Sequence, residues 1–144
     1  MIQETLNGLI MESMKAHDEV RTLTLRDIKS EYIKWKTKDE NIGKEMEEID
    51  EIKILQSMVK QRQDSASIYT KAGRSELAEK ELKQINVIKE YLPVASEEDI
   101  ANAFNQIELE PVKKNMSAFV NKIKEALPTA EGRAVADYVK SHLS

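Results

Sequence analysis

The sequence predicts an all-α protein with two lobes: an N-terminal four-helix lobe that contains an αα-hairpin, and a small C-terminal three-helix lobe. Apolar residues recur at helical spacing along almost the whole chain, and no segment alternates with period two for long. The 144 residues include only four glycines and three prolines, too few for a β-protein with many tight turns. Hydrophobic residues make up 40% of the chain, which is enough to form a core.

Two helices and a loop are expected first in the N-terminal lobe, which we assign to residues 1–93. The first helix covers about residues 2–17, where apolar side chains fall on one face. Asp18 is a residue of the type that caps a helix, and it precedes a second helix that continues to about residue 38. Residues 39–46 break the pattern and contain a glycine, which predicts a loop.

Two further helices complete this lobe. The third is expected over about residues 48–72, and Gly73 follows it at the position where a left-handed residue commonly ends a helix. We expect Ser75 to cap the fourth helix, which cannot continue through Pro93. The short connection between these helices predicts an αα-hairpin.

The C-terminal lobe, residues 94–144, shows shorter helical patterns. Ser96 precedes three acidic residues, the arrangement of a helix start with a favourable charge in its first turn. Asn115 is the expected cap of the next helix, and the last helix covers about residues 129–143. About 50 residues is small for an independent core.

The sequence contains no recognisable catalytic, cofactor-binding or metal-binding pattern. Cysteine is absent, which removes disulfides, thiolate metal sites and cysteine nucleophiles together. The glycines form neither a dinucleotide-binding fingerprint nor a phosphate-binding loop. His17 and His142 are far apart in sequence and fall at predicted helix ends, where a solvated histidine is common. We therefore assign no catalytic residue, no cofactor and no metal.

The chain start and the overall charge limit the class of protein. The first residues are amphipathic and do not resemble a secretory signal peptide, and no stretch approaches about 18 consecutive apolar residues. We therefore expect a cytoplasmic protein that does not associate with membranes. The net charge of −4 gives no indication of nucleic-acid binding, so any basic surface must be local, and we expect no binding of DNA.

Charge is distributed unevenly along the chain. Residues 19–38 carry six basic and three acidic side chains, and residues 113–144 again carry six and three. Residues 39–51 carry one basic and seven acidic side chains, including the run Glu45, Glu47, Glu48, Asp50 and Glu51, which we interpret as a solvated face or as favourable charge at a helix N-terminus. Basic patches suit contact with phosphate groups, but charge alone favours ordinary solvated helix faces.

Several motifs resemble those of the YqeY family. Residues 60–65 (KQRQDS) and 69–81 (YTKAGRSELAEKE) are similar to its KQRRDS and KAGRxDLAxKE signature. Residues 24–30 (TLRDIKS) are similar to its TLRxLKSA element, and residues 90–93 match its EYLP. The C-terminal match retains Gly132-Arg133-Ala134, but the glycines that the family has around Met116 and after Ala134 are replaced here.

The resemblance implies an all-α fold of two lobes. It also implies kinship with the C-terminal helical region of GatB, the B subunit of the glutamine-dependent Asp/Glu-tRNA amidotransferase. In that enzyme the helical region engages tRNA, while the kinase and amidase chemistry belongs to other domains. By this kinship the chain would be a module without the parts that activate an acyl group or release ammonia.

Three hypotheses about function follow. The first is a non-catalytic module that binds tRNA or another structured RNA, as an accessory to tRNA-dependent amidation. The second is an adaptor that docks on a protein such as an amidotransferase or synthetase component through an apolar groove. The third, a carbon–nitrogen ligase that takes its amide from glutamine, rests on family kinship alone. For the first, the candidate contact residues are Arg26, Lys29, Lys60, Arg62, Lys71, Arg74 and Arg133.

Overall fold

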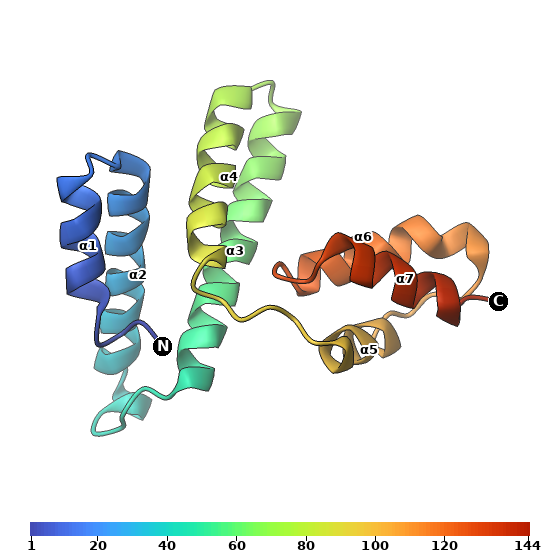
Figure 1. Cartoon of the computed structure of the whole chain (residues 1–144), viewed down its shortest axis with the longest axis horizontal. Helices are drawn as coiled ribbons and strands as arrows, with labels where there is room; N and C mark the ends of the chain where they lie inside the picture. Colours follow the sequence, from blue (N-terminus) through green and yellow to red (C-terminus); the bar gives the residue numbers. More distant parts are fainter. The chain divides into compact units, whose positions relative to one another are not determined.

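The computed structural model describes residues 1–144 and contains seven α-helices, two short 3₁₀ helices and no β-strand (Figure 1). This confirms the all-α prediction. The chain forms two compact units, Met1–Leu92 and Pro93–Ser144. We call them unit 1 and unit 2 and describe each by itself.

Unit 1 consists of two helical hairpins. α1 (Leu6–Lys15) packs against α2 (Glu19–Thr37), and α3 (Glu48–Lys71) packs against α4 (Ser75–Lys89) along most of its length (Figure 1). A 3₁₀ helix, η1 (Asp39–Asn41), lies in the loop between α2 and α3. The α3–α4 pair is the αα-hairpin that the sequence predicts.

Local signals account for most helix ends in unit 1. Asp18 caps α2, because its Oδ1 accepts a hydrogen bond from the backbone N–H three residues on, at 3.0 Å. Gly73 follows α3 with a φ of +73°, the left-handed conformation expected there. The predicted cap Ser75 is wrong. After the left-handed glycine it is Arg74 that turns the chain into α4, and the Arg74 carbonyl already accepts from Ala78 N–H at 3.1 Å.

The first helix begins later than predicted, at Leu6 rather than near residue 2. The cause is a contact with a distant part of the chain. The side chain of Gln3 donates a hydrogen bond to the Met46 carbonyl at 2.7 Å. The backbone N–H and the side-chain amide of Gln3 both donate to the Glu51 carboxylate. These bonds hold the first residues against α3 and out of the helix.

The core of unit 1 draws on all four helices and on the loop before α3. Its apolar members are each less than a tenth exposed, and burying each one fully stabilises the fold by roughly 1.5–3 kcal/mol before entropy is counted. They are Leu6, Ile10, Leu25, Ile28, Tyr32, Met46, Leu55, Met58, Val59, Ile85, Ile88 and Leu92.

Unit 2 contains three short helices, α5 (Glu97–Asn105), α6 (Met116–Ala126) and α7 (Gly132–His142), with a 3₁₀ helix, η2 (Lys113–Asn115), before α6. Its buried core consists of Ile100, Phe119, Ile123, Val135 and Val139. The Phe104 and Phe119 rings stack with their centroids 4.7 Å apart beside this core.

The helix starts in unit 2 were predicted with mixed success. Ser96 forms a complete capping box: its Oγ accepts from Asp99 N–H at 3.1 Å, and Asp99 accepts from Ser96 N–H at 2.9 Å. Asn115 stands at the N-cap position of α6, but its side chain donates to the Glu110 carbonyl at 2.9 Å and makes no cap bond. α7 begins at residue 132 rather than near 129, because Thr129 donates to the Pro93 carbonyl at 2.7 Å in the turn before it.

Candidate nucleic-acid interface

The exposed side of α3 carries a stripe of basic residues. At 100° per residue, Lys53, Lys60 and Lys71 fall within about 20° of one another around the helix axis. All three are exposed, and none takes part in an ion pair. From Lys53 to the end of α3 the one acidic residue is the exposed Asp64, which falls on the same face one turn after Lys60 and forms no ion pair with it. We call these three lysines the α3 stripe.

Arg74 extends this basic surface past the end of α3. It is exposed and unpaired, and it follows the left-handed Gly73 in the turn that begins just after Lys71. Of the seven candidate residues, Lys60, Lys71 and Arg74 are therefore brought onto one hairpin as free cations.

Arg26 and Lys29 belong to a different helix. Both are exposed on α2, and the Arg26 guanidinium lies 3.5 Å from the Met14 Sδ of α1. Neither is paired with a carboxylate. In unit 2, Arg133 is 93% exposed near the start of α7 and lies 4.0 Å from Asp137, a long and weak ion pair.

Arg62 has a structural role. Its guanidinium donates to Asp27 Oδ2 on α2 at 2.9 Å and to Gln84 Oε1 on α4 at 2.9 Å, and it also reaches the Met58 carbonyl at 3.3 Å. The side chain is only 14% exposed. Arg62 therefore ties three helices of unit 1 together, and its charge is not free for a phosphate in the way that of Lys60 is.

Glu51 is the clearest departure from the sequence interpretation. We interpreted it as part of a solvated acidic run, but its side chain is 1% exposed. Glu51 Oε1 accepts from Tyr32 Oη and from Gln3 N–H, both at 3.1 Å, and Oε2 accepts from the Gln3 amide at 3.2 Å. Burial raises the pKa of the Tyr32 hydroxyl well above its usual range, and the Glu51 charge adds to the effect. Gln3, Tyr32 and Glu51 therefore form a buried hydrogen-bonded cluster with a structural role.

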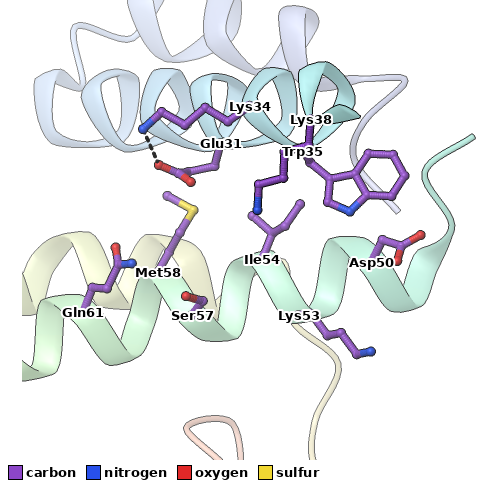
Figure 2. Close-up of a pocket in the computed structure, with 10 residues that line it drawn as sticks. All are labelled: Glu31, Lys34, Trp35, Lys38, Asp50, Lys53, Ile54, Ser57, Met58 and Gln61. Carbon is purple, nitrogen blue, oxygen red and sulfur yellow. Dashed lines mark hydrogen bonds and ion pairs between the residues drawn. The ribbon is translucent and has the colours of Figure 1, made fainter. Parts of the chain in front are cut away.

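A groove between α2 and α3 is the feature that the sequence analysis missed (Figure 2). It has a volume of about 390 Å³ and is lined by basic, polar and apolar side chains around the half-buried Trp35. Lys53 of the α3 stripe stands on its border. The signal was available in part, because Lys34 and Lys38 flank Trp35 within one turn of a helix.

The two histidines lie at helix ends, as expected. His17 follows α1 with a φ of +56°, and His142 is the last residue of α7, where its Nδ1 lies 2.8 Å from the Tyr138 carbonyl. Both are exposed. No three His, Asp or Glu side chains converge in an arrangement that could hold a metal ion. No helix is both long enough and apolar enough to cross a lipid bilayer.

These features define an all-helical protein in which one face of α3 carries exposed lysines beside a groove lined by Trp35. The chain belongs to the Yqey-like protein family, whose model matches residues 3–143. It is similar to the "Altered inheritance of mitochondria protein 41, mitochondrial" of two yeasts. The Clavispora lusitaniae protein is 33% identical over 132 residues, covering 87% of this chain and 75% of the relative. The Lachancea thermotolerans protein is 32% identical over 142 residues, covering 93% and 74%.

These relatives contradict the cytoplasmic localisation expected from the sequence. Proteins of the same name from Kluyveromyces lactis and Komagataella phaffii also match, and the names of all four describe them as mitochondrial. The cytoplasmic prediction was wrong because its evidence does not separate compartments. The absence of cysteine is compatible with more than one compartment, and an amphipathic start argues only against a secretory signal peptide.

Proposed function

We propose that this protein is a non-catalytic helical module that binds tRNA or another structured RNA through the phosphate backbone. The observation that carries the proposal is the α3 stripe with Arg74 beyond it. Lysine and arginine side chains are free to bind phosphates when they are not held in ion pairs. Lys60, Lys71 and Arg74 are exposed and take part in no ion pair, and the one carboxylate on the same face, Asp64, is outnumbered by these cations. Helical presentation of such residues suits recognition of RNA by shape and charge.

The role we infer is that of an accessory to tRNA-dependent amidation. The resemblance of the central motifs to the GatB tail makes tRNA the first RNA to test. An enzyme in its own right finds less support, since the buried carboxylate Glu51 accepts hydrogen bonds from Gln3 and Tyr32 and does not line the groove.

The test is a titration of the full chain with total tRNA at several salt concentrations. The proposal predicts binding whose affinity falls steeply with salt, because each neutralised phosphate contributes about 0.7–0.9 to the slope of log K against log salt. The variant Lys60→Glu/Lys71→Glu should then bind at least tenfold more weakly and flatten that slope by about 1.5. Arg62 is left intact, because reversing it would break the contacts between α2, α3 and α4.

The matched control is Lys15→Glu/Lys83→Glu, which changes the net charge equally. Both residues are exposed and lie on α1 and α4, away from the α3 stripe. The proposal predicts a loss of less than threefold for this control. Equal losses of tRNA affinity for the two variants would mean that the effect depends on net charge and not on the α3 stripe. No binding of tRNA at low salt would contradict the proposal outright.

A second candidate is the protein-binding adaptor, which one observation favours. Met11 and Met14 of α1 and Leu23 of α2 are 58%, 51% and 43% exposed, a high value for three large apolar residues on one hairpin. Substituting Met11 and Met14 with serine distinguishes the candidates. An adaptor would lose a co-purifying protein partner, whereas the RNA module would keep its affinity for tRNA.

A further inference from the structure

The groove between α2 and α3 has the dimensions of a small-molecule site. Its volume of about 390 Å³ falls at the lower end of the roughly 300–1,000 Å³ typical of such sites. The lining residues are Glu31, Lys34, Trp35 and Lys38 from α2 and its end, and Asp50, Lys53, Ile54, Ser57, Met58 and Gln61 from α3 (Figure 2).

Both carboxylates of the groove are already engaged. Glu31 accepts from Lys34 Nζ at 3.2 Å, and Asp50 Oδ2 accepts from Glu47 N–H at 2.9 Å as part of the cap of α3. Lys38 and Lys53 have no such partner. Figure 2 shows Lys38 extending from α2 toward Ile54, while Lys53 points along the outer side of α3. Lys38 is therefore the free cation directed into the groove, while Lys53 on its border points away from α2 and joins the groove to the outer face of α3.

The interior of the groove suits a flat heteroaromatic group. Trp35 contributes an indole that is only partly covered by the core, and the Asn41 amide fixes its backbone by donating to the Trp35 carbonyl at 2.9 Å. Across from α2, the side chains of Ser57 and Gln61 make no hydrogen bond within the protein. An aromatic platform, unpaired polar groups and nearby cations together match a nucleobase with its phosphate.

We propose that this groove binds an unpaired base of the bound RNA, stacked on Trp35, with one flanking phosphate on Lys38 and the continuing strand on Lys53 and the other lysines of the α3 stripe. This inference rests on the proposed function. The groove is continuous with the α3 stripe, because Lys53 belongs to both. This continuity supports an RNA strand as the ligand rather than a free nucleotide. One strand can thus follow the lysines of α3 and insert a base where α2 approaches.

Trp35 is the chain's single tryptophan, so all tryptophan emission of the folded chain comes from a side chain that lines this groove. Titration of the full chain with total tRNA should quench that emission, with a midpoint equal to the Kd from an independent binding assay. Inorganic polyphosphate, which has phosphates but no bases, should compete for the lysines and leave the emission within a tenth of its initial value. Quenching by polyphosphate to the same extent as by tRNA would overturn the base site.

Substitutions separate stacking from charge. Trp35→Leu keeps an apolar side chain against the core but removes the platform, and should weaken tRNA binding about tenfold with an unchanged salt slope. Trp35→Phe should stay within threefold of the natural chain. Gln61→Ala should cost about threefold, whereas Gln56→Ala, on the same helix outside the groove, should cost nothing measurable.

The outcomes distinguish this inference from the proposed function. Suppose that tRNA binds with a salt slope that depends on Lys60 and Lys71, yet Trp35 emission does not change. The RNA-binding function is then supported, and the base site in the groove is contradicted. If adenosine monophosphate quenches Trp35 while tRNA does not, the groove is a free-nucleotide site and the inference is overturned. Thermal melts verify that each variant folds, and the titration of the natural chain needs no variant.

Discussion

In unit 1 (Met1–Leu92) five polar side chains are buried, whereas unit 2 (Pro93–Ser144) buries none. The five are Ser13, Thr22, Thr24, Glu51 and Gln84. Each has a hydrogen-bond partner, and no buried side-chain polar atom in the structure is left unpaired. The core of unit 2 consists instead of five apolar residues beside a group of stacked aromatic rings.

This difference between the two cores shows two ways in which a sequence can favour one packing arrangement over others. In unit 1, Glu51 and Arg62 connect segments 19 to 48 residues apart in sequence, and a helix shifted by one residue would leave these groups buried without partners. In unit 2 the shape of a few large side chains must suffice, because a small core has little area to bury. Unit 1 is therefore expected to be tolerant of small losses of volume, and unit 2 to be sensitive to them.

The largest effect is expected from Phe119→Ala. Phe119 is 1% exposed and stacks on Phe104, so truncation should cost about 3–5 kcal/mol. A unit of about 50 residues has a total stability of roughly 3–8 kcal/mol. We expect amide hydrogen exchange to show loss of protection over residues 93–144 and retention in unit 1, since the two cores share no residue.

The control for this prediction is Val94→Ala. Val94 belongs to unit 2 but is 66% exposed, so its truncation should cost less than about 0.5 kcal/mol. Protection lost from both units in Phe119→Ala would mean that the comparison of two separate cores does not describe the protein.

A smaller effect is expected from Glu51→Gln. The amide keeps the shape of the side chain but has only one accepting oxygen, while its NH₂ group faces the donors of Tyr32 and Gln3. The free energy of unfolding of unit 1 should fall by about 2–3 kcal/mol. Urea titration followed by Trp35 fluorescence measures it, with Glu45→Gln, exposed and unbonded, as the neutral control. A decrease in the free energy of unfolding of less than about 0.5 kcal/mol would show that the hydrogen-bonded cluster around Glu51 does not stabilise unit 1.

Local signals in the sequence were sufficient for much of the fold. The caps at Asp18, Gly73 and Ser96 depend on residues within one turn, and the structure has all three. The prediction at Ser75 used the same kind of signal and was wrong, because Arg74 occupies the N-cap position of α4. Asn115 does occupy the N-cap position of α6, but its side chain bonds the preceding loop instead of the helix.

The site could be predicted less well, because its determinants are contacts between distant segments. Arg62 belongs to the family motif, but its partners Asp27 and Gln84 are 35 and 22 residues away. The burial of Glu51, in contrast, could have been predicted from the sequence. Glu51 falls within about 40° of Leu55 and Met58 around α3, and that placement predicts burial. The groove beside Trp35 also depends on a contact between separate segments, because it forms only where α3 approaches α2.

The smallest predicted effect concerns pH and separates the two units again. Burial raises the pKa of Tyr32 in the folded state above the value of about 10 in the unfolded chain, with the Glu51 charge as a second cause. The stability that this provides is complete below pH 10. Above it the unfolded state loses the proton first, so the stability of unit 1 declines by up to about 1.4 kcal/mol per pH unit.

Tyr32→Phe tests this dependence. At pH 7 the variant should be less stable than the natural chain by about 1 kcal/mol, because Glu51 loses a donor. Between pH 10 and 11 the natural chain should lose this advantage, since the variant has no hydroxyl to titrate at residue 32. Tyr69→Phe, whose hydroxyl makes no hydrogen bond within the protein, should keep the alkaline decline of the natural chain. A difference between Tyr32→Phe and the natural chain that stays constant up to pH 11 would assign the alkaline decline to other groups.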